Sequence, residues 1–536
     1  MTSNIIRPEK ILSDNEYRAI DDFCAARQGC ENLAAVAAFL REKFAVNLTT
    51  DPDIVSGYAD DSSNLPAHAD ALARPADERE AAAILRAGRA ARIPITLSGG
   101  RSNLTGSATA EGGILLSTAG FRGPAVEIDR EKARVRTPVN LILEDLRNKI
   151  LDETHNQLYF PVDPTSRGDA WIGGIIACNA SGFIPGEAGA TREWVESLEV
   201  LLPDGRKISV KRGEYISTDG EFIIDDGKQQ ISWPVPTYAR PAIKNASGPW
   251  SSPDGRIDLV DMFVGSEGIY GLVTGCTFRL APRPETYLDL FFSLSDEARA
   301  ISFYHYANQL LDGNLSEFSA FEYFGVNSLN YMDHRERFFH GDNQVAVYLQ
   351  VPVARRDELD RVTETWFTRI IDSDCGIDPE AVILLDSEPK RRLFMEARHS
   401  MPANALEVIQ RYGTCTIMTD ALVPPENFPA FLDYTHDLLR REGVEYLAFG
   451  HLGDCHLHFT LLPRREKMER AIELYDLIIA KAVELDGVYS GEHGTGKRKR
   501  KDFLTLYDQA AIDQLKACKG AIDPDFLLNR GNIFLP

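Results

Sequence analysis

Three glycine-rich segments, each beside a short apolar stretch, constrain the fold of this chain more than any other feature. They lie at residues 98–106, 172–182 and 264–271. Glycine has no Cβ, so consecutive glycines let the backbone bend sharply and present N–H groups to an anion. The first segment lacks the GxGxxG spacing of a dinucleotide fingerprint and the lysine of a P-loop. Each segment alone also fits an ordinary tight turn, so their order and spacing together carry the prediction.

The pattern of apolar residues predicts helices that alternate with short strands. Residues 1–50 look helical and amphipathic, and an alanine-rich stretch predicts a helix over 78–91. Short runs of β-type residues predict strands over 93–97, 195–202 and 271–280. We therefore expect an α+β fold.

Length and turn-forming residues predict three parts of the chain. With 536 residues it is long enough for two or three domains. We expect an N-terminal helical extension at 1–50 and a first domain at 51–283. That domain contains a turn-rich insertion over about 206–257. A second α+β domain, ending in a helical segment, is expected over 284–536.

Composition argues against several classes of protein. A formal net charge of −22 disfavours nucleic-acid binding, which needs clustered Lys and Arg. The one basic run, 497–501, is typical of a solvated face. The first residues lack the apolar stretch of a secretory signal, and no segment reaches the ~18 apolar residues of a transmembrane span. The eight cysteines form no CxxC pair, which predicts reduced thiols in a cytoplasmic protein.

Three histidines lie within eight residues, at His451, His456 and His458. Neutral imidazole is a common metal ligand, so this spacing indicates a metal site, with ordinary hydrogen-bonded histidines as the alternative. Alternation along a strand puts His456 and His458 on one face. His451 would face away in a straight strand, so it needs a turn at Gly453 and Asp454 to join them.

A second polar motif, Glu492-His493, lies in the glycine-flanked segment 489–496. Adjacent residues of a regular strand point in opposite directions. The flanking glycines permit an irregular backbone that can present both side chains to one cavity.

The order of the glycine-rich segments resembles that of FAD-linked oxidases with the vanillyl-alcohol oxidase and p-cresol methylhydroxylase fold. This resemblance implies a two-subdomain FAD-binding module of the p-cresol methylhydroxylase type, followed by a substrate or cap domain. It implies FAD bound non-covalently, because no histidine in these loops is available for a covalent link. Residues 98–106 would cradle the pyrophosphate. The residues implied to bind FAD are Ser98, Gly99, Gly100, Arg101, Ser102, Asn103, Gly106, Pro161, Asp163, Gly173, Gly174, Asn179, Ser181, Gly182, Gly189, Thr191, Gly265, Glu267, Gly268, Ile269 and Asn529.

The two later motifs resemble the D-lactate, glycolate and D-2-hydroxyglutarate dehydrogenase branch of that family, in which they form one site. Matched residue by residue, His451, His458 and Glu492 would bind a divalent metal. Zinc is the expected metal, with manganese or iron as alternatives. His493 would be the catalytic base, and Arg398 matches the arginine that clamps the substrate carboxylate.

The chain departs from the family pattern at several of these positions. Arg101 and Cys455 stand where glycine is usual, and His456 replaces a usual asparagine. His456 should line the pocket, and one interpretation is that it is an additional metal ligand. Met418 stands where many members have a carboxylate-binding lysine, so the side chain of the substrate stays open.

The resemblance implies oxidation of a small 2-hydroxy acid, of D configuration, to the 2-keto acid. The reaction would combine metal-assisted proton abstraction with hydride transfer to flavin N5. Because the cysteines are scattered, no iron–sulfur cluster is expected, and electrons leave to an external acceptor or a partner subunit. Two alternatives are a metal-free phenol-oxidising flavoenzyme of this fold and a catalytically idle FAD subunit that relays electrons. The oligomeric state stays open, with a homodimer as one arrangement.

Overall fold

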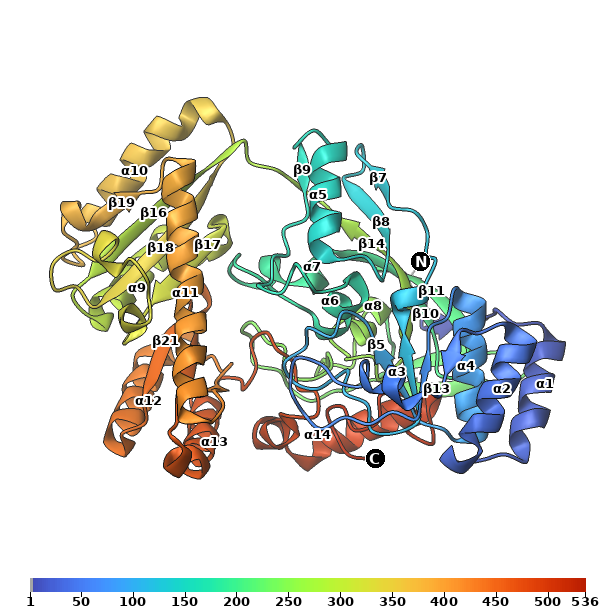
Figure 1. The fold of residues 1–536 in the computed structure, drawn as a ribbon. Coiled ribbons are helices and arrows are strands. Elements are labelled where there is room, and N and C mark those ends of the chain that lie inside the picture. Colours follow the sequence, from blue (N-terminus) through green and yellow to red (C-terminus); the bar gives the residue numbers. More distant parts are fainter. Residues whose placement is uncertain (1–2) are drawn as a thin grey trace.

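Residues 3–536 are described by a computed structural model, in which helices and strands form two lobes (Figure 1). The first lobe contains two larger sheets and the second contains one. Both helices and sheets build each lobe, which confirms the expected α+β fold. Among the helices of this part of the chain, none is long and apolar enough to cross a membrane.

A four-stranded sheet, in the order β3-β4-β6-β5, carries the first glycine-rich segment at the end of β5. Strands β4, β6 and β5 are parallel. Helices α1, α2 and α4 pack together beside it, and Figure 1 shows them side by side. The bounds are α1 Asp14–Ala25, α2 Leu33–Phe44, β3 Leu48–Thr49, β4 Ala71–Ala73, α4 Glu78–Ala91, β5 Ile95–Ser98 and β6 Ile114–Ser117.

Local sequence explains where these helices begin. The side chain of Ser13 accepts a hydrogen bond from the backbone of Glu16, whose carboxylate bonds back to the Ser13 backbone. This reciprocal capping box satisfies two of the free N–H groups of α1. Asp77 caps α4 in the same position through a bond from the Glu80 backbone.

The second sheet of the first lobe has six strands in the order β2-β11-β10-β14-β8-β7. Its neighbouring strands are antiparallel. The short helix α6 contains the first part of the second glycine-rich segment and packs near β14. The bounds are β2 Glu9–Lys10, β7 Glu127–Asp129, β8 Arg134–Pro138, α5 Leu143–Glu153, α6 Ile172–Cys178, β10 Val195–Leu201, β11 Arg206–Lys211 and β14 Leu272–Arg279.

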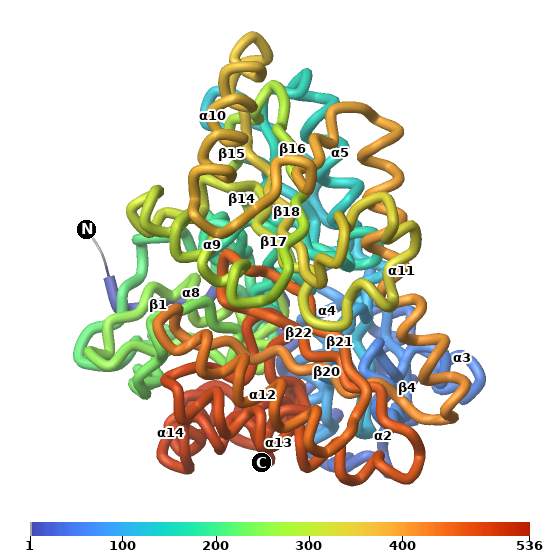
Figure 2. Tube along the Cα trace, turned by 90° about the vertical axis from the view of Figure 1, so that its left-hand side faces the viewer, coloured from blue at the N-terminus to red at the C-terminus, as the bar shows by residue number. Residues whose placement is uncertain are grey.

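The turn-rich segment expected over about 206–257 contributes β11 to the six-stranded sheet and two further strands to a small three-stranded sheet. Strands β12 (Glu221–Asp225) and β13 (Gln230–Pro234) pair with each other, and β12 also pairs with β1 (Ile5–Ile6). The long C-terminal helix α14 (Arg500–Ile522) packs against β13. Figure 2 shows α14 beside α13 (Met468–Glu484) of the second lobe, so the end of the chain bridges both lobes.

The second lobe is built on a seven-stranded sheet in the order β19-β16-β18-β17-β21-β22-β20. Helix α11 covers one face, and α9 covers the other. Two adjacent residues of β16 illustrate the alternation: the Phe291 ring lies 5.5 Å from that of Phe394 in α11, and Phe292 lies 4.9 Å from Phe303 in α9. The bounds are β16 Thr286–Leu294, α9 Glu297–Leu310, β17 Ala320–Phe324, β18 Val345–Val353, α10 Leu359–Ile371, β19 Val382–Leu384, α11 Glu388–Tyr412, β20 Ile417–Met418, α12 Phe428–Glu442, β21 Tyr446–His451 and β22 His456–Leu461.

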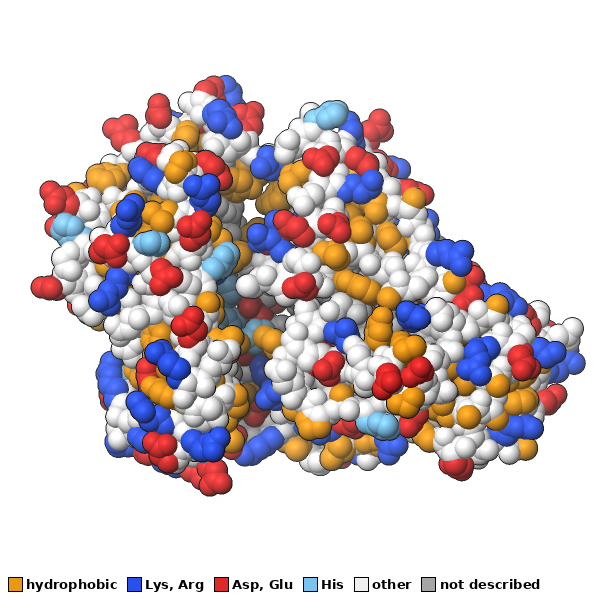
Figure 3. All heavy atoms as spheres, in the orientation of Figure 1, with side chains coloured by type: hydrophobic (Ala, Val, Ile, Leu, Met, Phe, Trp, Pro, Cys, Tyr) orange, Lys and Arg blue, Asp and Glu red, His pale blue; other side chains and the backbone are white. Residues whose placement is uncertain are grey.

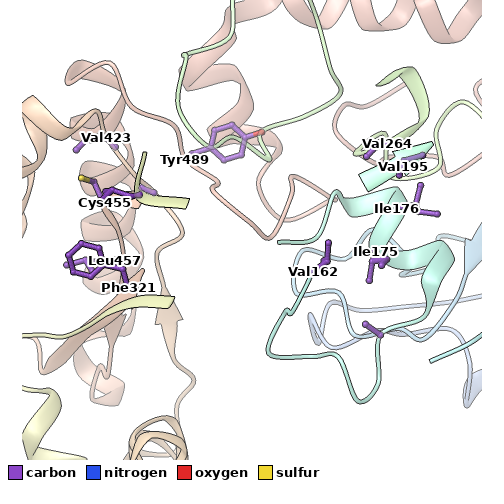
Figure 4. Close-up of a cluster of buried hydrophobic side chains, with 14 of the residues drawn as sticks. Val162, Ile175, Ile176, Val195, Val264, Phe321, Val423, Cys455, Leu457 and Tyr489 are labelled. Atoms are coloured by element: carbon purple, nitrogen blue, oxygen red, sulfur yellow. The ribbon is translucent and has the colours of Figure 1, made fainter. Parts of the chain in front are cut away.

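The largest hydrophobic core continues from one lobe to the other. It contains Ile175 and Ile176 of the first lobe and Phe321 and Leu457 of the second. Figure 4 shows these as two groups of side chains, with Tyr489 on the chain segment between them. One hydrophobic core therefore includes buried residues of both lobes.

Candidate active site

A cavity of about 470 Å³ lies along the glycine-rich segments. Residues of all three segments line it, together with Asn529 near the C-terminus. Glu492 and His493 of the second polar motif also line it. The glycine-rich segments and the Glu492-His493 motif therefore meet at one cavity. The predicted residues found in the lining are Ser98, Gly99, Gly100, Arg101, Ser102, Asn103, Gly173, Gly174, Ser181, Glu267, Gly268, Asn529, Glu492 and His493.

Steric limits explain two of the glycines around this cavity. A Cβ on Gly100 would lie 2.3 Å from the Asp169 carbonyl oxygen, so the turn closes only without a side chain. Gly268 has a φ of +72°, and a Cβ there would lie 2.5 Å from Asn529 Nδ2. Arg101 has a φ of 59°, the left-handed conformation for which glycine is usual.

The histidine cluster is built on the β21–β22 hairpin. Its register places His451 directly opposite His456. A short turn at Leu452–Asp454 reverses the chain, and Cys455 follows with a φ of 52°. The expected turn thus brings His451 back beside the other two histidines. The left-handed backbone also explains why glycine is common at the position of Cys455.

Four side chains converge in this region: His451, His456, His458 and Glu492. One ligand atom from each lies within 4.8 Å of all the others. His451 Nε2 is 3.2 Å from Glu492 Oε1, although these residues come from different elements. The structure therefore brings together the three expected metal ligands, His451, His458 and Glu492. His456 lies beside them as a fourth side chain.

Two of the histidines have their outer ring nitrogens fixed by the protein. His451 Nδ1 is 2.6 Å from Glu322 Oε1, and His458 Nδ1 is 3.2 Å from the Thr419 carbonyl oxygen. These partners leave each Nε2 free to face the cluster, as is usual for metal-binding histidines. Burial lowers the pKa of His458 well below its ordinary value. Against burial, the carboxylates of Glu322 and Glu492 raise the pKa of His451 to about 10.

The loop that carries Glu492 and His493 is irregular, as its glycines predict. Glu267 holds this loop, because its carboxylate accepts bonds from the Thr495 and Gly496 N–H groups at 2.6 and 2.8 Å. Burial raises the pKa of Glu267 to about 7. Glu267 thus binds the loop of Glu492 and His493 through its carboxylate, a contact that sequence patterns did not predict.

Asp420 is a buried carboxylate that the sequence did not single out. Its Oδ2 accepts a bond from the His493 backbone N–H at 3.0 Å and lies 3.4 Å from His493 Nδ1. Lys499 Nζ lies 2.8 Å from the same oxygen. Lys499 and Lys497 are buried, so the prediction of a solvated face for the basic run is wrong at these two positions. Burial lowers the pKa of His493, and Asp420 partly opposes that shift. Asp420 therefore orients His493, which stacks at 5.5 Å on His458.

Lys244, from the turn-rich insertion, is a second unpredicted partner of the cluster. Its ammonium lies 2.7 Å from Glu492 Oε1 and 2.9 Å from Asp454 Oδ2. All three side chains are largely buried. Burial opposes ionisation of Glu492, but the charges of His451 and Lys244 hold its pKa well below the usual range.

Arg398 lies near the cluster but mainly lines a second cavity of about 320 Å³. Its guanidinium is 2.9 Å from Glu322 Oε2, the carboxylate that also contacts His451. It stacks over the Phe183 ring at 4.7 Å. Met418 pairs in register with Thr460, at the edge of the sheet. Figure 3 shows histidine side chains in the cleft between the lobes.

Comparison with known proteins assigns both parts of the chain. Residues 69–211 match the family described as FAD binding domain, and residues 316–533 match the FAD linked oxidases, C-terminal domain. The chain is a member of the FAD-linked oxidase family. A glycolate oxidase subunit GlcD of Bacillus subtilis is 28% identical to it, over 87% of this chain and 89% of that protein.

Two further relatives of this FAD-linked oxidase have related names. A D-lactate dehydrogenase of Anaerostipes hadrus is 24% identical, over 87% of this chain and 90% of its own length. A D-2-hydroxyglutarate dehydrogenase of Stutzerimonas stutzeri is 24% identical, over 90% and 95%. The FAD-linked oxidase is accordingly an FAD-dependent oxidoreductase.

Solved structures show the same fold. A p-cresol methylhydroxylase with substrate bound superimposes with a TM-score of 0.66 at 13% identity, covering 98% of both chains. A 4-ethylphenol oxidase from Gulosibacter chungangensis gives 0.65 at 14% identity, with the same coverage. The FAD-binding module and C-terminal domain expected from the resemblance are thereby confirmed as the fold of this FAD-linked oxidase.

The larger cavity of the FAD-linked oxidase fits its cofactor. Glycines and small side chains form much of its wall, and they allow close approach of a flat ring and a pyrophosphate. Ser98 Oγ is buried there without a hydrogen-bond partner in the protein, which suits contact with a polar ligand.

Several residues implied to bind FAD do not line this cavity. Two of them make internal contacts: Asn179 Oδ1 accepts a bond from the Arg192 N–H, and Thr191 Oγ1 donates to the Ala180 carbonyl. Pro161 and Asp163 line the second cavity instead. A Cβ on Gly182 would lie 2.5 Å from the Asp163 backbone, so this glycine permits close packing. The residues outside the lining are Gly106, Pro161, Asp163, Asn179, Gly182, Gly189, Thr191, Gly265 and Ile269.

Proposed function

We propose that this FAD-linked oxidase is a 2-hydroxy-acid dehydrogenase that requires a divalent metal. His451, His458 and Glu492 would hold the metal, and His493 would be the catalytic base. The observation that carries the proposal is the convergence of these side chains beside the glycine-lined cavity. The names of three relatives, which refer to glycolate, D-lactate and D-2-hydroxyglutarate, support the substrate class.

The donor set fits a divalent metal. Two imidazoles and one carboxylate are typical of a catalytic site that keeps positions for substrate. Their outer partners, Glu322 and the Thr419 carbonyl, already fix both rings. When bound, the metal would supply Lewis acidity that lowers the pKa of a substrate hydroxyl.

His493 would remove the hydroxyl proton of the substrate. A general base must be unprotonated, and burial lowers the pKa of His493. Asp420 lies beside Nδ1, which leaves Nε2 as the proton acceptor. Bound FAD would supply the hydride acceptor, N5 of its ring. The product would be a 2-keto acid.

Arg398 would bind the substrate carboxylate through part of its planar guanidinium. One of its N–H groups already donates to Glu322, so the remaining donors would face the substrate. Met418 places no cation at the position where many relatives have lysine. We therefore propose that the substrate is a small D-2-hydroxy acid whose side chain has no negative charge near Met418.

We further propose that electrons leave to a separate acceptor in a reducing, cytoplasmic environment. All eight cysteines are free thiols, and they are dispersed through the chain. An iron–sulfur cluster needs several thiolates close together.

The test is a panel of 2-hydroxy acids, each enantiomer separately, mixed anaerobically with the FAD-loaded, metal-loaded protein. Bleaching of the flavin absorbance reports its reduction. We expect one small D-2-hydroxy acid to reduce the flavin fastest, and removal of metal by a chelator to abolish that reduction. Rapid reduction by a 4-alkylphenol, without any response to hydroxy acids, would contradict the proposal.

A further inference from the structure

His456 is fully buried in the histidine cluster, yet no protein atom satisfies its ring. The side chain has 0% exposure, and neither ring nitrogen has a hydrogen-bond partner. An unpaired buried polar group costs about 1–3 kcal/mol. Such a position is stable when a ligand completes it.

A second buried histidine shows the ordinary alternative. His436 Nδ1 is 2.8 Å from the Tyr446 hydroxyl, and Nε2 is 3.2 Å from Glu297 Oε1. Both nitrogens of His436 are therefore satisfied within the protein. Both residues are buried imidazoles in the same lobe. They differ in that only His436 has hydrogen-bond partners for its ring nitrogens.

The ring of His456 is oriented as a ligand would be. Nδ1 faces the cluster and lies 4.0 Å from Glu492 Oε1. Its ring centre is 4.6 Å from that of His458 and 5.7 Å from that of His451. With ligand bonds of about 2 Å, opposite ligands of one cation stand about 4 Å apart. The spacing within the cluster is of this order.

The opposite side of the ring faces a carboxylate. Nε2 lies 3.1 Å from Asp420 Oδ1, outside hydrogen-bond geometry. His451 likewise has Glu322 on its outer side, and His458 has the Thr419 carbonyl. All three histidines thus present one nitrogen inward and have an acceptor behind the other, the arrangement typical of metal ligands.

We propose that His456 is a fourth protein ligand of the metal, bound through Nδ1. This inference rests on the proposed function, because it adds to the same metal site. Three imidazoles and one carboxylate would fill a four-coordinate zinc site completely. A six-coordinate cation such as Mn²⁺ or Fe²⁺ would keep two positions, which suits a substrate that offers hydroxyl and carboxylate oxygens. Such a ligand set favours a six-coordinate cation over a four-coordinate zinc.

The decisive variant is His456→Asn, which introduces the residue that the related dehydrogenases usually have. Full-length, FAD-loaded protein is stripped with a chelator and titrated with Mn²⁺, and free Mn²⁺ is followed by electron paramagnetic resonance. We expect the Kd for Mn²⁺ to rise at least about 10-fold, as for lost support of a metal site. X-ray absorption should count three imidazoles on the metal in the native protein and two in the variant.

The matched control is His436→Asn, a buried histidine outside the cluster, which should leave the Kd for Mn²⁺ unchanged. FAD content and Tm identify any variant that has failed to fold, and His456→Gln then serves as the second variant. Equal Kd values and equal imidazole counts for native protein and His456→Asn would overturn this inference and leave the proposed function standing. If the native protein binds no divalent cation, the proposed function fails as well.

Discussion

The glycine-lined cavity and the histidine cluster adjoin each other, but they are built in opposite ways. The cavity depends on what is missing, because Gly100 and Gly268 lie where any Cβ would collide with a neighbour. The cluster depends on charged side chains that hold one another, such as Glu322 behind His451 and Asp420 beside His493.

This difference determines what each region tolerates. A cavity of backbone and small residues should lose cofactor affinity when a side chain is added, with little change in charge. A cluster of buried ions should lose stability or catalysis when one partner is removed, because the remaining charge is left unpaired.

The largest effect should come from His493→Ala, next to the cluster. Loss of a general base typically slows the chemical step by roughly 100- to 10,000-fold. We expect flavin reduction by the best hydroxy acid to slow by this amount, measured by anaerobic stopped flow. FAD and metal content should stay normal, and native-like reduction would exclude His493 as the base.

Lys244→Met should destabilise the cluster without touching the cavity. The variant leaves the buried carboxylates of Glu492 and Asp454 without their shared cation. Removing one partner of a buried ion pair costs about 3–5 kcal/mol. Urea unfolding of the metal-free protein measures this loss. Lys244→Arg, which keeps the charge, is the control and should lose less; an unchanged midpoint in Lys244→Met would contradict the expectation.

Two alanine substitutions separate packing from cofactor binding. Gly182→Ala places a Cβ 2.5 Å from the Asp163 backbone, so it should lower the free energy of unfolding by about 1–3 kcal/mol. At Gly174, which lines the cavity, a Cβ meets nothing within 4 Å. Gly174→Ala should therefore keep the stability of the apoprotein and weaken FAD binding by roughly 10-fold. Equal FAD affinity in native protein and Gly174→Ala would place the flavin elsewhere.

The pH profile of the reaction tests how the cluster tunes its base. Since His493 must be unprotonated and burial lowers its pKa, the acidic limb of kcat/KM should lie below the ordinary imidazole value of about 6.5. Asp420 raises that pKa, so Asp420→Asn should move the limb to still lower pH while slowing the reaction. Movement to higher pH would show that Asp420 does not act on His493 in this way.

The smallest effect concerns the left-handed residue at the cavity rim. Arg101 has a φ of 59°, which costs about 1 kcal/mol relative to glycine. Arg101→Gly and Arg101→Ala both remove the side-chain bond to the Gly57 carbonyl. Only the glycine variant relieves the backbone, so it should be more stable by about 1 kcal/mol, measured as a difference in urea midpoint. A more stable alanine variant would mean that the backbone changes conformation.

Much of the fold could be predicted because its signals are local. Strand alternation predicted that His456 and His458 share a face, and a turn was needed to return His451 to them; β21 and β22 have this arrangement. The glycines around Glu492 predicted an irregular loop, which the structure also has. The placement of Gly182 and Thr191 outside the cavity lining was not predicted, because glycines that permit packing and glycines that face a ligand look alike in sequence.

The sequence by itself determined several helices and strands, the family and the residues that form the inner side of the cluster. Only the tertiary structure decided which groups support them: Lys244 for Glu492, Glu322 for His451, and Asp420 for His456 and His493. These partners are isolated polar residues, distant in the chain from the side chains they hold. Periodicity and turn chemistry act over a few residues, so a contact made by folding distant segments together leaves no such local pattern.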